Sequence, residues 1–289
     1  MTQDARGLPR FRPGLYLLHK PVGATSFDLV RDFMEEIRAS GIANRKLPVC
    51  HGGALDPFAE GLLLLLAGPA TRLMELFHPV PKVYEAQIEW GRETDNGDLL
   101  GKTVAEGGAG HLTPAMLDAA LARFTGWQDQ VPPLTSNKRI GGERAYEKAH
   151  RGEVFELPPS RVYLHEAAFL GHDLPRGSRV RLSVKGGYYV RSLARDLGRA
   201  VGCPAHLSKL LRTAIGPYMD PSVDMAAPRR QFFHGRNLLP WLPATDAPPG
   251  WQLPEGFPRT AHVRRFDGDK LVAILDPGGA EVIRLGSGI

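Results

Sequence analysis

The stretch HGGALDPFAEG, residues 51 to 61, places one histidine and one aspartate beside a pair of glycines. An aspartate at such a place can carry out chemistry as a carboxylate, or it can have a plainer structural role. Asp is a favoured helix N-cap and Pro suits the first helical position, so Asp56-Pro57 predicts the start of a helix. His51 taken alone is more often structural than catalytic, and Gly52-Gly53 predicts a tight turn. The motif by itself leaves the structural and the chemical interpretation open.

Basic side chains gather in two segments of a chain whose net charge is +5 and whose sequence pI is about 9.3. The segment from Arg176 to Arg212 has nine basic residues against one acid, Asp196, which gives it a net charge of +8. A second basic run extends from Lys138 to Arg151 and is interrupted by two glutamates. Such clusters suit the phosphates of a nucleic acid, because each neutralised phosphate releases a counterion. Solvated surface faces are the alternative explanation.

Composition limits the class of protein. The 289 residues, 43% of them hydrophobic, suffice for one large domain and a small additional unit. The longest apolar run, Leu62 to Ala67, is far shorter than the roughly 20 residues of a membrane helix. The N-terminus lacks the apolar stretch of a signal peptide, so we expect a cytoplasmic protein without membrane contact. Cys50 and Cys203 lack metal-ligand spacing, so we expect no structural zinc.

The elements that must position these residues can be predicted from the periodicity of apolar side chains. A strand is predicted over residues 15–18, followed by a Pro/Gly turn and a helix that begins at Thr25 or Ser26. The apolar face of this helix is expected to comprise Phe27, Val30, Phe33, Met34 and Ile37. Residues 83–90 alternate apolar and polar side chains, as in a half-buried strand.

The remaining part of the main domain mixes helices and strands. One helix is predicted from Thr113-Pro114 to near Gly126 and another over residues 190–201. Two further strands are predicted, one over residues 161–174 and one in the stretch 178–193 that leads into the helix at 190. Because strands and helices do not alternate regularly, we predict the α+β class, with a mixed, largely antiparallel central sheet and flanking helices.

The C-terminal part of the chain has a different composition. Residues 236–258 are rich in proline and predict a linker after a main domain of residues 1–235. Residues 259–289 contain three short strands separated by turns, which predicts a small β meander. A unit of about 30 residues hardly stands alone, so we expect it to pack against the main domain.

The run H-G-G-A-L-D-P-x-x-x-G-L-L resembles motif II of the tRNA pseudouridine synthase B (TruB) family, G-H-T-G-A-L-D-P-x-A-x-G. Four further blocks resemble the family in the family's order: LHKPVGATSF, KVYEAQIEWGRETDNGDLLG, VPPLTSNKRIGGERAYEKAHRG and KGGYYVRSLARDLGRAVGCPAHLSKLLR. Together the blocks extend from Leu17 to about Arg212. The chain departs from the family pattern at Cys50, Gly52, Asn96, Thr135, Asn137 and Tyr188.

The resemblance implies the pseudouridine synthase fold for residues 1–235, with an RNA-binding insertion at about residues 130–155. The meander at residues 259–289 would be a reduced PUA-like unit. The implied reaction breaks the N1–C1′ bond of a uridine, turns the base and joins C5 to C1′. The base must first leave its stack, because a folded loop shields the reacting atoms. An isomerisation has no redox or phosphoryl-transfer step, so we expect no cofactor and no metal.

The resemblance also implies three catalytic residues. Asp56 would act at the ribose, either as a nucleophile at C1′ or as the base that forms a glycal intermediate. Arg191 would lie near it, and a neighbouring arginine lowers the pKa of an aspartate by roughly 1–3 units. Tyr84 would stack on the uracil, and its hydroxyl would take the proton from the sugar. Such stacking is worth roughly 1–3 kcal/mol per base.

Five further residues are implied to bind the substrate. Tyr189 would pack on the other side of the base pocket, and Leu210 would close it as an apolar wall. His51 would fill the gap left by the flipped uridine, and Lys20 would support the active-site loop. Arg139, in the insertion, would lie on the T loop. The implied partner is therefore the T arm of tRNA, with nucleotide 55 as target, bound by a monomer without guide RNA or protein partner.

Three alternative interpretations remain open at this point. A dyskerin-type synthase works inside a guide-RNA particle, but that family reads G-T-L-D-P and has a full-length PUA domain. Here Ala54 precedes Leu55 and the tail is short, which favours a stand-alone enzyme. A non-catalytic RNA-binding protein would use Asp56 only as a helix cap. A metal nuclease would use the neighbouring Asp95 and Asp98, although a single D-x-x-D is weak support.

Overall fold

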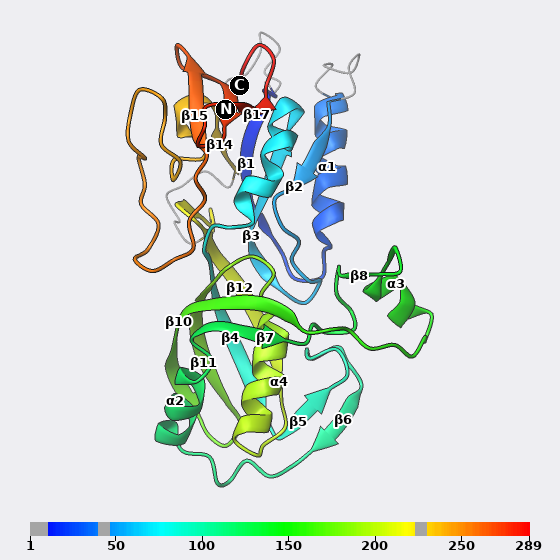
Figure 1. The fold of residues 1–289 in the computed structure, drawn as a ribbon. Coiled ribbons are helices and arrows are strands. Elements are labelled where there is room, and N and C mark those ends of the chain that lie inside the picture. Colours follow the sequence, from blue (N-terminus) through cyan, green and yellow to red (C-terminus); the bar gives the residue numbers. More distant parts are fainter. Residues whose placement is uncertain (1–10, 40–46, 223–229) are drawn as a thin grey trace. The chain divides into compact units, whose positions relative to one another are not determined.

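The computed structural model describes residues 11–39, 47–222 and 230–289. The chain forms two compact units, which Figure 1 shows as a ribbon. Unit 1 comprises Met1–Lys82 and Arg212–Ile289, and unit 2 comprises Val83–Leu211. The chain passes between the units inside two strands, β4 (Lys82–Trp90) and β12 (Ala205–Ile215).

Unit 1 is built on antiparallel strands in the order β14-β1-β3, and β2 also pairs with β3. The strands are β1 (Gly14–Lys20), β2 (Val49–His51), β3 (Glu60–Ala67) and β14 (Arg230–Phe233). The consecutive leucines of β3 are fully buried, and alternate residues enter two different cores. Leu62, Leu64 and Leu66 enter one core, whereas Leu63 and Leu65 enter the other. A strand buried on both faces explains this uninterrupted apolar run.

The predicted helix after Asp56-Pro57 is wrong. Residues 57–58 form a turn, and β3 comes directly after it. An Asp-Pro start signal is local and does not determine the structure of the residues beyond it. The leucines that come next are all buried. A central strand with an apolar core on each face can bury them, because alternate side chains point to opposite faces.

Helix α1 (Ser26–Ala39) begins at the predicted residue and covers one face of the unit 1 strands through Val30, Phe33 and Ile37. The prediction for Phe27 is wrong, because its side chain is 66% exposed. Ser26 is buried instead and bonds to the backbone of Leu55. With Ser26 turned inward, the next residue, about 100° further round the helix, faces solvent.

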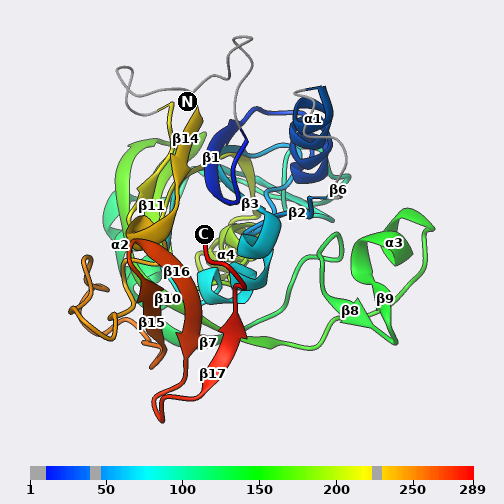
Figure 2. The same cartoon turned by 90° about the horizontal axis from the view of Figure 1, so that it is seen from above.

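The C-terminal residues belong to unit 1. Three antiparallel strands, β15 (Val263–Asp267), β16 (Lys270–Leu275) and β17 (Glu281–Arg284), form the predicted meander, which Figure 2 shows in orange and red. Leu271, Ile274 and Leu285 share a core with β1, β3 and the 3-10 helix η1 (Gly68–Phe77). The Pro-rich stretch enters the same core, through Leu238, Leu239, Trp241 and Leu242. The short 3-10 helix η2 (Gly235–Asn237) overlaps the start of this stretch. The division into catalytic domain, linker and small C-terminal domain stays a prediction.

Unit 2 contains the strand order β12-β4-β11-β10-β7. Its other long strands are β7 (Gly126–Gln130), β10 (Ser160–Asp173) and β11 (Gly177–Val184). Helix α2 (Pro114–Ala122) begins at the predicted cap, because the Thr113 side chain accepts from Met116 N. Helix α4 (Val190–Ala200) ends just before Gly202, whose φ of 67° suits glycine. Together with unit 1, these elements confirm the α+β class.

Two small hairpins complete unit 2. Strands β5 (Arg92–Thr94) and β6 (Thr103–Glu106) pair around a turn that contains Asp95 and Asp98. Strands β8 (Arg139–Ile140) and β9 (Glu143–Arg144) lead into helix α3 (Ala145–His150) within the predicted insertion. Figures 1 and 2 both show this segment apart from β10 and β11.

A short strand, β13 (Tyr218–Met219), pairs with the end of β12 in unit 1. In the described part of the chain, no helix is long and apolar enough to cross a membrane.

Candidate active site

Asp56 lies in the loop that joins β2 to β3, residues 52–59, called here the Asp56 loop. The residue is half-buried, and its carbonyl oxygen accepts from Ala59 N at 3.1 Å, which closes the turn. Because a strand comes next, Asp56 does not cap a helix. Its side chain is thus not committed to the capping role that spacing alone favoured.

Ser26 holds the residue before Asp56. Its Oγ accepts from Leu55 N at 2.8 Å and donates to Leu55 O at 3.2 Å, and the side chain is buried. One hydroxyl can act in both ways because it has one proton and two lone pairs. The first turn of α1 therefore fixes the backbone on the N-terminal side of Asp56.

Arg212 holds the first half of the same loop. Its Nη2 donates to Gly53 O at 2.9 Å, its Nη1 to Ala54 O at 3.3 Å and its Nε to Leu62 O at 2.8 Å. The side chain is 1% exposed. A planar guanidinium can reach several carbonyl oxygens at once, which the ammonium of lysine cannot do in the same geometry. Arg212 therefore ties the start of the loop to β3.

Lys20 and Gly23 support the other side of the Asp56 loop. Lys20, at the end of β1, is fully buried and donates from Nζ to Pro21 O and Ala24 O, both at 2.8 Å. These two bonds close the turn of residues 21–24. Within it, Gly23 has a φ of 89°, and its N–H donates to Pro57 O at 2.7 Å. Burial lowers the pKa of Lys20 to about 8, and the charge of Asp56 opposes this shift. The supporting role of Lys20 at the active site stays a prediction.

His51 is the last residue of β2 and is half-buried. Its Nδ1 accepts from Gly53 N at 3.4 Å, a long contact across the Gly-Gly turn. The φ of 131° at Gly53 is one that residues with a Cβ rarely adopt, so the predicted tight turn is present.

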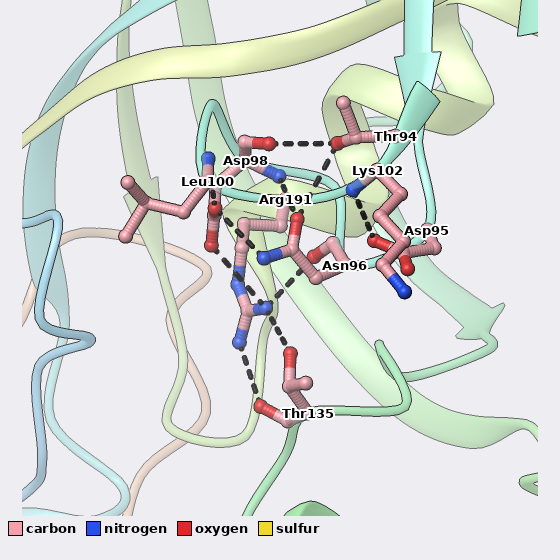
Figure 3. Close-up of polar contacts among 8 residues, drawn as sticks. All are labelled: Thr94, Asp95, Asn96, Asp98, Leu100, Lys102, Thr135 and Arg191. Atoms are coloured by element: carbon pink, nitrogen blue, oxygen red, sulfur yellow. Dashed lines mark hydrogen bonds and ion pairs between the residues drawn. The ribbon is translucent and has the colours of Figure 1, made fainter. Parts of the chain in front are cut away.

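Arg191 lies at the centre of a cluster of polar contacts in unit 2, which Figure 3 shows. It lies in the first turn of α4, is 3% exposed and donates from Nη1 to Asn96 O and to Thr135 Oγ1, both at 2.8 Å. Its Nη2 donates to Thr135 O at 3.0 Å. The Asp98 carboxylate lies 3.7 Å from Arg191 Nη1 and is itself buried. Arg191 therefore joins the β5–β6 turn to the first part of the insertion, at Thr135.

The two aspartates of the D-x-x-D pair serve the β5–β6 turn. Asp95 Oδ1 accepts from Lys102 N at 2.9 Å, and Asp98 Oδ1 accepts from Asn96 Nδ2 and Leu100 N, both at 2.9 Å. Figure 3 shows the two carboxylates on different sides of the turn. Over residues 11–39, 47–222 and 230–289, no group of three or more His, Cys, Asp or Glu side chains could hold a metal ion.

Tyr84 and Leu210 are buried residues of β4 and β12. Tyr189 immediately precedes α4 and exchanges two hydrogen bonds with the Gln130 side chain through its backbone. Its own side chain is half-buried, whereas Tyr188 is buried, and burial raises the pKa of Tyr188. Of the two neighbouring tyrosines, Tyr189 is therefore the more accessible, and its place in the base pocket stays a prediction.

Arg139 is exposed in β8, and its Nη1 donates to Gly142 O at 2.7 Å. The basic run of the insertion is partly neutralised within the segment itself. Lys148 and Arg151 both pair with Glu143 and Glu153.

The large basic segment also divides into separate groups. Arg191 and Arg212 are buried, whereas Arg195 pairs with Asp196 and Arg199 with Glu93. The net charge of +8 therefore does not describe one continuous basic surface.

The predicted site residues fall into two sets. Unit 1 contains Lys20, His51 and Asp56, and unit 2 contains Tyr84, Arg139, Tyr189, Arg191 and Leu210. Their assembly around one uridine stays a prediction. The sequence reasoning missed Ser26 and Arg212 as supports of the Asp56 loop. For Arg212 the sequence does carry a signal, because a charged residue within the largely apolar strand AHLSKLLRTAI indicates a buried side chain with hydrogen-bond partners.

Comparison with known proteins gives consistent matches. The family model described as TruB family pseudouridylate synthase (N terminal domain) matches residues 42–190. The model of the tRNA pseudouridylate synthase B C-terminal domain matches residues 191–228. Both matches agree with the order of the sequence blocks described above.

Several relatives are named tRNA pseudouridine synthase B. The protein of Prochlorococcus marinus is 38% identical over 73% of this chain and 66% of its own length. The protein of Thermobifida fusca is 38% identical over 81% of this chain and 79% of its own length. The protein of Bordetella parapertussis is 36% identical over 80% of this chain and 96% of its own length. The chain thus spans about two thirds of the first relative and nearly all of the last.

Solved structures agree on the fold. A Cbf5-Nop10-Gar1 complex contains a chain that matches 94% of this protein and 82% of its own length, with a TM-score of 0.61 and 21% identity. A likeness at this identity supports the pseudouridine synthase fold alone. With both family models and the relatives in agreement, the chain belongs to the TruB family of pseudouridylate synthases.

Proposed function

We propose that this chain isomerises a uridine of tRNA to pseudouridine, with Asp56 as the residue that acts on the ribose. Family membership supports the reaction type, and the Asp56 loop supports the choice of residue. Backbone groups on both sides of Asp56 are held by Ser26, Arg212 and Gly23. Such support positions a reacting side chain in advance, which lowers the entropic cost of reaching the transition state.

Asp56 has two chemical routes open to it. As a nucleophile, its carboxylate attacks C1′ while the N1–C1′ bond breaks, and the detached uracil turns before C5 attacks C1′ and displaces the Asp56 carboxylate. As a base, it removes the proton at C2′ while the N1–C1′ bond breaks, which leaves a glycal. C5 of the turned uracil then bonds to C1′, and the proton returns to C2′. Both routes end with loss of the C5 proton, and both need an ionised carboxylate.

Three residues of unit 2 complete the proposed site. In this proposal Arg191 supplies a positive charge to the site, Tyr84 stacks on the uracil and takes the proton from the sugar, and Tyr189 packs against the base from the other side. Leu210 closes the pocket, and His51 fills the gap that the flipped uridine leaves. The Asp98 carboxylate beside Arg191 holds the guanidinium in place.

For the substrate we propose the T arm of tRNA, with nucleotide 55 as the target and Arg139 of the insertion on the T loop. No guide RNA or protein partner takes part, and the enzyme acts as a monomer in the cytoplasm. Neither a cofactor nor a metal ion is needed, because the isomerisation transfers no electrons and no phosphoryl group.

Pseudouridine mapping at nucleotide resolution tests this proposal. Unmodified tRNA is incubated in EDTA with wild-type protein or with Asp56→Asn, which keeps the size of the side chain but removes its charge. We expect one T-loop uridine to be converted by the wild type and none by the variant, while both proteins bind the tRNA. Binding without conversion by the wild type would make the chain an RNA-binding protein and not an enzyme.

A further inference from the structure

Gln130, the last residue of β7, holds the backbone of Tyr189 with its side chain. Its Oε1 accepts from Tyr189 N at 2.9 Å, and its Nε2 donates to Tyr189 O at 3.1 Å. The Gln130 side chain is buried, with 2% of the residue exposed. One amide thus exchanges two hydrogen bonds with one residue, as a hydrogen-bonded pair does in an antiparallel sheet. These two bonds fix the orientation of the Tyr189 backbone as well as its position.

The segment that contains Tyr189 depends on such an anchor. It begins with the pair Gly186-Gly187, and Gly187 has a φ of 93°. Glycines allow many backbone conformations, so they do not hold the residues that follow. Tyr189 is also the N-cap residue of α4, and a tyrosine lacks the short polar side chain that usually caps a helix. The amide of Gln130 therefore supplies from another element the support that this segment lacks.

A fixed backbone limits the directions that the Tyr189 ring can take. Tyr189 O also accepts from Leu193 N at 3.2 Å, so the same carbonyl group is held by α4 and by Gln130. On a backbone held in this way, the side chain chooses among a few staggered rotamers. The Tyr189 residue is half-buried, which leaves part of it accessible. Gln130 therefore acts on the direction of the ring through the backbone.

The contact between the end of β7 and the start of α4 continues beyond this pair. Val131 O accepts from Ser192 Oγ at 2.8 Å and from Arg195 Nη2 at 3.0 Å. Further along, Thr135 accepts two hydrogen bonds from Arg191. The Gln130 amide is thus the first of several contacts along the N-terminal part of α4, which includes two of the predicted site residues.

We propose that Gln130 is a positioning residue for the isomerisation, because it sets the place of the Tyr189 ring against the uracil. This inference rests on the proposed function and adds to it a residue that touches neither the substrate nor the reacting atoms. Gln130 orders the glycine-containing segment before RNA binds, so the substrate does not have to order it. A misplaced ring would leave the detached uracil poorly oriented for the attack of C5 on C1′. The effect therefore falls on the chemical step and not on RNA binding.

The test compares Gln130→Met with Gln128→Met. Methionine is about as long as glutamine and can fill the same buried space, but it cannot exchange these hydrogen bonds. Gln128 lies on the same strand, and its Nε2 donates to Phe124 O at 2.5 Å, so its loss also removes a bond to a backbone carbonyl. Gln130→Asn, whose amide is one methylene shorter, is the second variant at the site. The single-turnover rate on tRNA, the Kd for tRNA and the free energy of unfolding are measured for each protein.

Both Gln130 variants are expected to lower the single-turnover rate about tenfold, while the Kd for tRNA stays within about twofold of the wild-type value. Gln128→Met should keep the wild-type rate. A double-mutant cycle with Tyr189→Leu, which removes the ring, shows whether the effect passes through Tyr189. In that background, Gln130→Met should lower the rate no more than about twofold. The same loss of rate in both backgrounds would overturn the proposal, and so would wild-type rates in both Gln130 variants.

Amide hydrogen exchange of residues 186–193 examines the anchor without turnover. Exchange should be faster in Gln130→Met than in the wild type and in Gln128→Met, because the segment is released. Unchanged exchange would overturn Gln130 as the anchor of Tyr189. Faster exchange in Gln130→Met together with a wild type that converts no uridine would support the anchor and contradict the proposed function.

Discussion

Ser26 Oγ bonds to both backbone polar groups of Leu55, accepting from its N–H at 2.8 Å and donating to its carbonyl at 3.2 Å. One buried hydroxyl thus fixes the residue directly before Asp56. Ser26→Ala leaves these two groups without that partner, which should lower the free energy of unfolding by about 1–3 kcal/mol. The reaction rate at saturating RNA should fall as well.

Ser178→Ala provides the matched control for Ser26→Ala. Ser178 is also buried and contacts Trp90 Nε1 and His172 Nδ1, but it lies in unit 2 on β11. Chemical denaturation should show a similar loss of stability for both variants, with turnover reduced only in Ser26→Ala. Equal turnover in the two variants would contradict a positioning role for Ser26.

Arg212→Lys should slow the chemical step while leaving the Kd for RNA unchanged. Lysine keeps the positive charge but cannot donate to Gly53 O, Ala54 O and Leu62 O at once, so the start of the Asp56 loop is released. Single-turnover kinetics on tRNA measures the effect, with a fall of about tenfold or more expected from misplacement of the carboxylate.

Arg264→Lys is the comparison for Arg212→Lys. Arg264 is buried and donates to Arg236 O and Leu238 O, so it ties the Pro-rich stretch to β15. This variant should be less stable but should turn over normally while folded. A normal single-turnover rate for Arg212→Lys would show that the loop keeps its geometry without the guanidinium.

Asp98→Asn should reduce turnover by about tenfold or more, because the neutral amide no longer pairs with Arg191 and the guanidinium can shift. Glu93→Gln is the control, since it weakens the ion pair between the buried Glu93 and the exposed Arg199 in the same unit. The measurement is the single-turnover rate of each variant. Equal single-turnover rates for the two variants would contradict the claim that Asp98 positions Arg191 for the reaction.

Lys20 predicts a pH dependence of stability. Burial lowers its pKa in the folded state to about 8, below the value of about 10.4 in the unfolded chain. Between these values the unfolded state binds more protons, so this group makes the protein more stable as pH rises. Below pH 8 the cost of the buried charge is fully present.

Comparison with Lys20→Met isolates that contribution. From pH 7 to pH 10, the free energy of unfolding of the wild type should rise by about 2 kcal/mol relative to the variant. Denaturant titrations at several pH values measure the difference. A constant difference between the two proteins would contradict the lowered pKa.

The elements with clear periodicity were predictable from the sequence. The strict alternation of β4 and the start of α2 at Thr113-Pro114 are properties of short segments, and the structure confirms both. The end of α4 before Gly202 has the same local origin. The helix after Asp56 was wrong because a local start signal was outweighed by burial of the leucines of β3 on both faces.

The candidate site was predictable only in part. Resemblance to a family predicted Asp56 and Arg191 as site residues, but the contacts around them join residues far apart in the sequence. Arg212 reaches Gly53 across 159 residues, and Arg191 reaches Asn96 across 95. No periodicity carries information of that kind. The basic segment from Arg176 to Arg212 is a second case. Its net charge can be counted from the sequence, but the burial of Arg191 and Arg212 cannot be seen there.

The central claim is that Asp56 carries out an isomerisation on a uridine of tRNA. The most direct measurement is tritium release from tRNA labelled at C5 of uridine, under single-turnover conditions in EDTA, for wild type and Asp56→Asn. We predict release by the wild type, none by the variant, and the same Kd for tRNA in both. Release by Asp56→Asn at the wild-type rate would contradict the account, because the reaction would then proceed without the carboxylate.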